Sequence, residues 1–160
     1  MKLVVGKRKL NFVLATADKW HRYEDIIKNS PLYDHYFKGN NHFTEWFKQF
    51  LDEGIVIVET EFGEPIGLLI IDWAGMGGEF PYLFLLGVKD GYRGQGIGEC
   101  LLETFFELCR NRGFKTAFIA CSDFNPRAKA LYESVGFEDL CFIPDLYIDG
   151  VGEYFLMKKL

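Results

Sequence analysis

The spacing of apolar residues along the chain predicts helices in the first third. An apolar run over Leu10–Ala15 predicts a strand, and Asp18 is the expected N-cap of a helix that runs to about Lys28. Pro31 is expected to break that helix. A second helix is predicted over Asn41–Leu51, because aromatic residues recur there at three- to four-residue spacing.

From residue 55 the pattern changes to that of strands. Ile55–Thr60 and Ile66–Trp73 are apolar and rich in β-branched residues, and Glu61–Pro65 between them has the composition of a hairpin connection. Gly75–Gly78 is expected to be a loop, followed by a long apolar strand over Phe80–Val88.

The remainder of the chain alternates helices and strands. Leu101–Cys109 carries the inner face of an amphipathic helix that ends at Gly113, and Asn125 and Pro126 open another that Gly136 closes. The strands expected here are Phe114–Cys121, Glu138–Ile143 and Glu153–Lys158.

This order, β-α-α-β-β-β-α-β-α-β-β, predicts a single α/β domain over residues 1–160. Its central sheet should be mixed and twisted, with about seven strands and with helices on both faces. The strand–helix–strand unit around residues 80–121 should form a right-handed parallel crossover. A chain of 160 residues has the size of one domain.

Composition narrows the class of protein. Hydrophobic residues make up 49% of the chain and charged residues 26%, which is typical of a globular protein. No apolar run approaches the roughly 18 residues of a membrane span. Residues 1–9 carry charges where a signal peptide needs its apolar stretch, so a cytoplasmic protein is expected. A net charge of −5 disfavours nucleic acid and anionic membranes as partners.

The cysteines and histidines show no metal-binding or redox spacing. Cys100, Cys109, Cys121 and Cys141 form no C-x-x-C pair, and we expect all four to be reduced residues of the packed interior. The three histidines follow no metal-ligand pattern. No metal is therefore expected.

The stretch Val88–Gly98 is the most informative for chemistry. It is rich in glycine and lies between a predicted strand and the N-terminus of a predicted helix. Backbone without Cβ atoms can approach an anion closely, and the helix dipole adds positive potential there. The stretch is thus a candidate pyrophosphate site, although neither G-x-G-x-x-G nor the P-loop motif fits it.

Two motifs resemble those of the GNAT family, the GCN5-related N-acetyltransferases. Arg93, Gly96 and Gly98 fit that family's Arg-x-x-Gly-x-Gly loop. Asn125–Phe137 fits its N-x-x-A-x-x-L-Y-x-x-x-G-F segment at every fixed position. The resemblance implies a GNAT fold with an acetyl-CoA-binding core over about residues 80–137.

The resemblance also implies which residues bind acetyl-CoA. The pantetheine arm would pair with Leu86, Gly87 and Val88, where the strand is expected to bulge at Gly87 and to splay from its neighbour. Asn125 would contact the same arm, besides capping its helix. The backbone N–H groups implied to hold the pyrophosphate are those of Arg93, Gly94, Gln95, Gly96, Ile97 and Gly98.

Three catalytic roles follow from the same resemblance. Tyr132 would protonate the departing thiolate, and the Val88 N–H would stabilise the oxyanion. Tyr132 could instead be only a packing residue. Family members often carry a glutamate on the strand that corresponds to Phe80–Val88, which contains no acid here. Glu79 is the candidate base and Asp72 the alternative; each could be merely solvated, and the acceptor could also arrive partly neutral.

The uneven distribution of charge suggests the acceptor. From Asp52 to Glu79 there are seven acids and no Lys or Arg. Two of these acids, Glu61 and Glu64, are expected to be only a solvated hairpin tip. The sequence therefore predicts transfer of an acetyl group from acetyl-CoA to a primary amine of a small cationic acceptor. A protein N-terminal or lysine acetyltransferase and a non-catalytic acyl-CoA-binding module remain alternatives, and a homodimer is possible.

Overall fold

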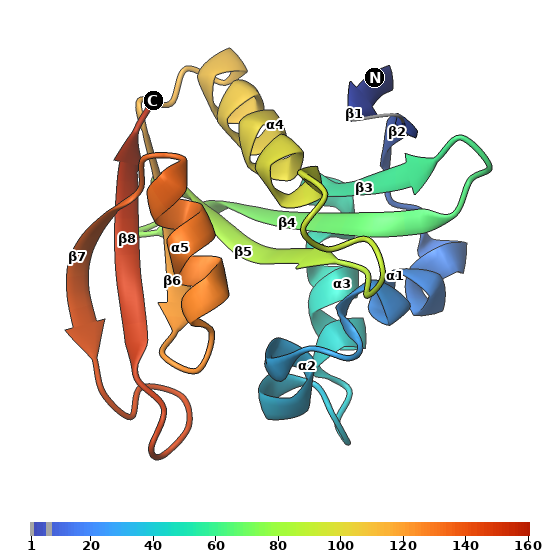
Figure 1. Cartoon of the computed structure of the whole chain (residues 1–160). Coiled ribbons are helices and arrows are strands. Elements are labelled where there is room, and N and C mark those ends of the chain that lie inside the picture. The colour runs from blue at the N-terminus through green and yellow to red at the C-terminus, as the bar shows by residue number, and fades with distance from the viewer. Residues whose placement is uncertain (1, 6–7) are drawn as a thin grey trace. The chain divides into compact units, whose positions relative to one another are not determined.

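The computed structural model describes residues 2–5 and 8–160, with side chains from Lys9 onward except at position 53 (Figure 1). The expectation drawn from residues 1–9 rests partly on Met1, Gly6 and Lys7, which lie outside the described residues. The chain forms two compact units, one of Met1–Ile71 with Leu85–Leu101 and one of Asp72–Phe84 with Leu102–Leu160. Both units draw residues from β4 (Pro65–Met76), β5 (Phe80–Val88) and α4 (Ile97–Asn111).

The first unit contains an antiparallel sheet. Its strands follow the order β1-β2-β3-β4, and Leu10 pairs with Thr60 and Ile55 with Ile70. The described residues thus include β1, a strand that the sequence pattern does not predict. The first three strands are β1 (Lys2–Val5), β2 (Arg8–Leu14) and β3 (Ile55–Thr60).

Three helices follow β2 and differ in part from the sequence expectation. They are α1 (Trp20–Ile27), α2 (Pro31–Tyr36) and α3 (His42–Gly54). Asp18 was expected as the N-cap of α1, but it lies within a 3-10 turn over Ala17–Lys19, and Lys19 caps α1. The reason is local: extended Thr16 accepts a hydrogen bond from the Lys19 N–H (3.2 Å), so the chain turns one step earlier.

Pro31 begins a helix instead of only ending one. The Ser30 hydroxyl oxygen accepts a hydrogen bond from the Tyr33 N–H (3.1 Å), and Pro31 occupies the first turn. This combination is a standard start signal for a helix, because proline has no N–H to leave unpaired there.

Aromatic and aliphatic side chains from these helices bury the sheet of the first unit. Phe43 stacks on Phe47, and Phe47 contacts Tyr23 of α1. The first turn of α4 packs on β4 at Gly67, where an added Cβ would lie 3.3 Å from Ile97. In Figure 1, α1 and α3 lie on one side of β3 and β4 and the first turn of α4 on the other.

The second unit contains both parallel and antiparallel pairs. Tyr82 and Leu83 of β5 pair with Phe118 and Ile119 of β6, which confirms that these two strands are parallel, as predicted. The further pairs, β6 with β8 and β8 with β7, are antiparallel. The strands are β6 (Thr116–Ser122), β7 (Glu138–Ile143) and β8 (Glu153–Lys159). A mixed α/β sheet is therefore confirmed, with eight strands among the described residues.

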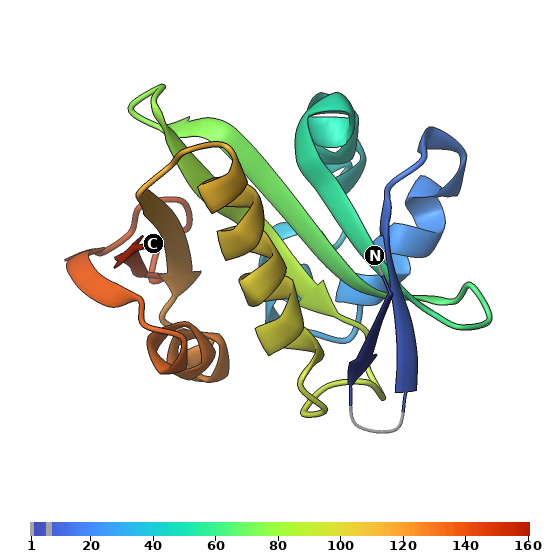
Figure 2. The same ribbon diagram turned by 90° about the horizontal axis from the view of Figure 1, so that it is seen from above.

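Two helices pack in the second unit. Phe105 and Phe106 of α4 are fully buried, and the Phe106 ring contacts Phe137. Helix α5 (Pro126–Ser134) packs against β6. Figure 2, the view from above, shows the full length of α4 from the side. Among the described residues, no helix is long and apolar enough to cross a membrane.

Candidate functional site

The predicted site residues divide between the two units. Residues 86–98, from the end of β5 to the first turn of α4, belong to the first unit. Glu79, Asn125 and Tyr132 belong to the second. Each group has a geometry of its own.

The glycine-rich loop joins β5 to α4. Gly91, Gly94 and Gly96 have φ angles of 83°, 70° and 83°, in the left-handed region where a Cβ is strained. Gly96 directly precedes Ile97, the first residue of α4, and its carbonyl accepts the Cys100 N–H at 3.1 Å. The first amide groups of a helix have no acceptor within it, and alternating left- and right-handed backbone aims successive N–H groups at one point. Left-handed glycines directly before a helix start are features that anion-binding loops share.

The Arg93 side chain is engaged with backbone carbonyls. Its Nε donates to the Val88 carbonyl at 2.9 Å, and its terminal nitrogens donate to the carbonyls of Asn29 (2.8 Å) and Lys28 (3.2 Å). Asp90 lies 3.9 Å from the guanidinium. The backbone N–H of Arg93 belongs to the predicted pyrophosphate loop, whereas its guanidinium is bound to the end of α1 and of β5.

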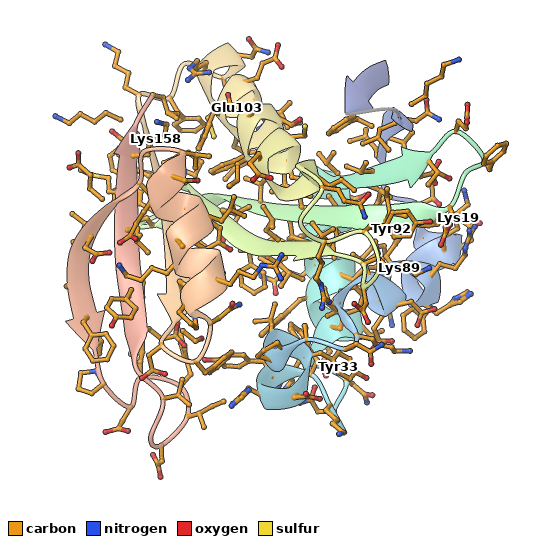
Figure 3. The ribbon with its side chains drawn as sticks, in the orientation of Figure 1. Lys19, Tyr33, Lys89, Tyr92, Glu103 and Lys158 are labelled. Atoms are coloured by element: carbon orange, nitrogen blue, oxygen red, sulfur yellow. The ribbon has the colours of Figure 1, made fainter. Side chains whose placement is uncertain are left out.

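Glu64 holds the other side of the loop. Its two carboxylate oxygens accept hydrogen bonds from Lys89 Nζ and Tyr92 Oη, each at 2.8 Å (Lys89 and Tyr92 are labelled in Figure 3). The bonds from Lys89 and then from Tyr92 lower the pKa of the Glu64 carboxyl. The expectation that Glu64 is only a solvated hairpin residue is wrong, because it binds two side chains of the loop. The sequence around Glu64 gives no sign of these partners, since they lie 25 and 28 positions away.

Gly87 is required by packing. An added Cβ at this position would lie 2.7 Å from Cγ2 of Ile27, so the end of α1 rests on the backbone of β5. The φ angle of Gly87 lies outside the left-handed region. Close approach of α1 therefore explains this glycine, and the bulge expected at Gly87 stays a prediction.

Tyr132 is buried in α5. Its ring packs edge-on against Phe137 at 6.2 Å between centroids, and the residue is 7% exposed. Burial, followed by the Cys121 thiol and the Tyr82 hydroxyl, raises the pKa of the Tyr132 hydroxyl above its ordinary value. Tyr132 consequently keeps its proton at neutral pH, as a proton donor must.

Asn125 is the N-cap of α5. Its side-chain oxygen accepts the Ala128 N–H at 3.2 Å, which confirms the capping role expected from the sequence. The preceding turn is fastened to the start of β8, because Asp123 exchanges two hydrogen bonds of 2.9 Å with Gly152.

The acids of the second unit differ in exposure. Glu79 is exposed in the β4–β5 turn, and the carboxylate of Asp72 accepts the Ala74 N–H at 3.1 Å. Glu153 is 3% exposed and accepts a hydrogen bond of 2.6 Å from the Ser122 hydroxyl. Sequence reasoning did not single out Glu153, because one acid at the start of an alternating strand gives no sign of burial.

The cysteines are free, but they do not all lie in the interior. Cys109 and Cys121 are buried, and burial raises the pKa of each thiol to about 12. Cys141 is exposed, so the expectation that all four are packed is wrong. All of β7 is exposed, and an apolar sequence does not reveal which strand has an open face. Among the side chains that the structure describes, those of residues 9–52 and 54–160, no group of His, Cys, Asp or Glu is arranged to hold a metal ion.

Comparison with known proteins gives three informative relatives. The bovine thialysine N-epsilon-acetyltransferase is 35% identical over 74 residues, which is 46% of this chain and 44% of that protein. The crystal structure of the ribosomal-protein-S18-alanine N-acetyltransferase from Escherichia coli aligns with a TM-score of 0.74 at 19% identity, over 94% of this chain and 93% of that one. A GNAT family acetyltransferase from Elizabethkingia anophelis with acetyl-CoA bound gives a TM-score of 0.70 at 18% identity, over 94% and 98%.

The matched stretch is thus less than half of the bovine protein. The structural likenesses establish the fold. The model of the acetyltransferase (GNAT) family matches residues 20–137, which include the glycine-rich loop and the segment that ends in Gly136 and Phe137. The chain belongs to the GNAT acetyltransferase family.

Proposed function

We propose that residues 1–160 act as one N-acetyltransferase domain, which moves an acetyl group from acetyl-CoA to a primary amine within a ternary complex. The observation that carries the proposal is the loop before α4, in which Gly94 and Gly96 have left-handed φ angles of 70° and 83° and present backbone without a Cβ. Its backbone N–H groups from Arg93 to Gly98 would bind the pyrophosphate. Membership of the GNAT family supports this role.

The proposed mechanism assigns the donor end of the reaction to three residues. Leu86 and Gly87 present backbone to the pantetheine arm, and the Val88 N–H donates to the oxygen of the thioester carbonyl. A fixed donor to such an oxyanion contributes about 3 kcal/mol. Asn125, whose side-chain oxygen is used in capping, would contact the same arm through its amide nitrogen.

Tyr132 completes the transfer in this proposal. The amine nitrogen bonds to the carbonyl carbon, the carbon–sulfur bond breaks, and the Tyr132 hydroxyl gives its proton to the thiolate. The Tyr132 hydroxyl is protonated at neutral pH, as a proton donor must be, and the burial that raises its pKa makes it a weaker acid toward the thiolate. Before the attack, one proton of the acceptor ammonium leaves through water to Glu79, which frees the amine. The second proton leaves the nitrogen as the carbon–sulfur bond breaks and returns through water to the Tyr132 oxygen.

A small cationic amine is the proposed acceptor. Seven acids and no Lys or Arg lie between Asp52 and Glu79, and a relative in the family acetylates thialysine, according to its name. Opposite charges about 4 Å apart attract by roughly 4 kcal/mol at an effective dielectric constant of 20, before desolvation. One acid beside the acceptor could therefore dominate selectivity.

A peptide N-terminus is the second candidate acceptor. The likeness in fold to the ribosomal-protein-S18-alanine N-acetyltransferase favours it. A cytoplasmic location and a homodimer complete the proposal.

The test is a turnover screen with acetyl-CoA against polyamines, amino acids, aminoglycosides and short peptides, in which release of free thiol is measured. For a small cation, kcat/KM should fall as ionic strength rises, and Glu79→Gln should lower kcat/KM more than Glu61→Gln. A neutral or anionic preferred acceptor would refute the acceptor class. Binding of acetyl-CoA without turnover of any amine would identify a binding module instead.

A further inference from the structure

Arg93 presents an unusual set of partners for an arginine in a phosphate-binding loop. Three of its nitrogens, Nε, Nη1 and Nη2, donate to three different backbone carbonyls at 2.8–3.2 Å. Guanidinium is a planar fork that carries only donors, so its directional capacity is largely committed to these acceptors.

Two of the carbonyls belong to Lys28 and Asn29, the two residues that follow α1. The last carbonyls of a helix have no partner within it, and the helix dipole makes that end negative. Here the Ser30 hydroxyl donates to the Ile27 carbonyl (2.5 Å), while Arg93 takes those of Lys28 and Asn29. Asn29 has a φ of 56°, so this turn is fixed in a sparsely populated conformation. Arg93 therefore holds the turn that follows α1, from a loop more than 60 residues away.

The third carbonyl belongs to Val88. The peptide group between Val88 and Lys89 is held at both ends, because its C=O accepts from Arg93 and its N–H donates to the Ile66 carbonyl at 2.9 Å. The preceding residue, Gly87, is backed by Ile27 at the end of α1. One side chain thus ties the end of α1 to the backbone segment that carries the Val88 N–H.

We propose that Arg93 is a positioning residue, whose guanidinium fixes the Gly87–Lys89 backbone and the end of α1 for transfer and does not bind the pyrophosphate. This inference rests on the proposed acetyl transfer and deepens it. The alternative role for an arginine in this loop is a direct ion pair with a phosphate, which would govern affinity for the donor.

The test compares Arg93→Gln and Arg93→Lys with two donors, acetyl-CoA and S-acetylpantetheine, which lacks the pyrophosphate. Positioning predicts that kcat falls by about 10- to 100-fold with both donors, as for a small misplacement of reacting groups. The Kd for CoA, measured by calorimetry, should stay within about threefold of wild type. Lysine should not rescue, because its three N–H donors share one nitrogen, whereas Arg93 reaches the three carbonyls from three separate nitrogens. Arg110→Gln, at an exposed position on α4, controls for loss of charge.

A loss confined to acetyl-CoA, a tenfold or larger rise in the Kd for CoA, or rescue by lysine would overturn the proposal. Hydrogen exchange gives a readout that needs no turnover. Without any ligand, Arg93→Gln should speed amide exchange in peptides that cover residues 26–31 and 86–90. If Arg93 served only to bind the pyrophosphate, the substitution would leave exchange in the ligand-free protein unchanged. A wild-type protein that turns over no amine would refute the proposed function alone, while unchanged exchange in Arg93→Gln would refute this inference.

Discussion

The Cγ2 methyl of Ile27 lies over the backbone of Gly87, so close that a Cβ added to the glycine would be 2.7 Å from it. We predict that Gly87→Ala destabilises the fold by about 1–3 kcal/mol, the usual cost of overpacking, and lowers turnover. Denaturant unfolding measures the first effect and release of free thiol the second.

The contact also predicts coupling between the two positions. Ile27→Ala removes the clashing methyl, so Gly87→Ala should cost less in that background, and a double-mutant cycle should show it. Additive effects would mean that Ile27 does not limit position 87.

A second prediction concerns the glycine before α4. Gly96→Asp adds a strained side chain at a φ of 83° and a negative charge beside the proposed pyrophosphate, so it should abolish stabilisation by acetyl-CoA. For the wild type, acetyl-CoA at a hundredfold excess over its Kd raises the free energy of unfolding by about 2.7 kcal/mol. Thermal melts with and without acetyl-CoA measure this stabilisation in the wild type and in the variant. Gly96→Ala separates strain from charge and should retain part of the shift; an undiminished shift in Gly96→Asp would exclude this loop as the pyrophosphate site.

The third prediction concerns the carboxylate that binds Lys89 and Tyr92. Glu64→Gln loses the charged acceptor, and the Kd for acetyl-CoA should rise by about two- to fivefold, a modest effect because exposed ion pairs contribute little. Glu61→Gln, on the same hairpin and exposed, should leave the Kd unchanged. Equal effects of the two substitutions would mean that Glu64 acts only through general charge.

Glu64 also contributes to the stability of the fold, and the pH dependence of that contribution has a definite sign. The pKa of Glu64 is lower in the folded protein than in the unfolded chain. Its contribution to stability is therefore present above the unfolded pKa and is lost as the pH falls through the lower, folded value. Between wild type and Glu64→Gln, the difference in Tm should shrink on acidification and stay constant near neutral pH.

The fourth prediction concerns the proposed acid. Tyr132→Phe keeps the buried ring and removes the hydroxyl, so kcat should fall by about 100-fold while the Kd for acetyl-CoA is nearly unchanged. Because burial raises the pKa of Tyr132, the wild-type rate should show no loss from ionisation of this group up to pH 10. An unchanged kcat, where chemistry limits the rate, would leave Tyr132 a packing residue.

The fifth prediction separates the four thiols. Cys141 should react rapidly with a disulfide reagent in the native protein, whereas Cys109 and Cys121, buried and with pKa values of about 12, should react only on unfolding. Cys141→Ser should remove most of the native reaction and thus the background of a thiol-release assay. Equal rates for all four thiols in the native protein would contradict this order.

Local signals predicted the elements that depend on local structure. The Asn125–Pro126 start of α5 agrees with the structure, because a helix cap and a proline in the first turn act within a few residues. The bounds of β7 also agree with the prediction. Ser30 and Pro31 gave an equally local signal for α2 that the sequence interpretation did not use.

The fastening of the loop could not be predicted in this way. The partners of Arg93 are separated from it by 64 and 65 positions in the sequence, and those of Glu64 by 25 and 28 positions. Such partners are chosen by the tertiary fold, since any exposed glutamate or arginine has the same sequence appearance. The family motif identified the loop, and only the structure showed what holds it.

The two units also constrain how the chain can be made. Residues 72–84 leave the ribosome before residues 85–101, yet they belong to the second unit while the later segment completes the first. A nascent chain that ends at Leu101 holds every residue of the first unit, but its Tyr82 and Leu83 still lack Phe118 and Ile119, their parallel partners. An apolar strand with an unpaired edge invites association with other chains. Folding during synthesis therefore passes through a stage at which the start of β5 needs protection, and it ends only after β6 has emerged.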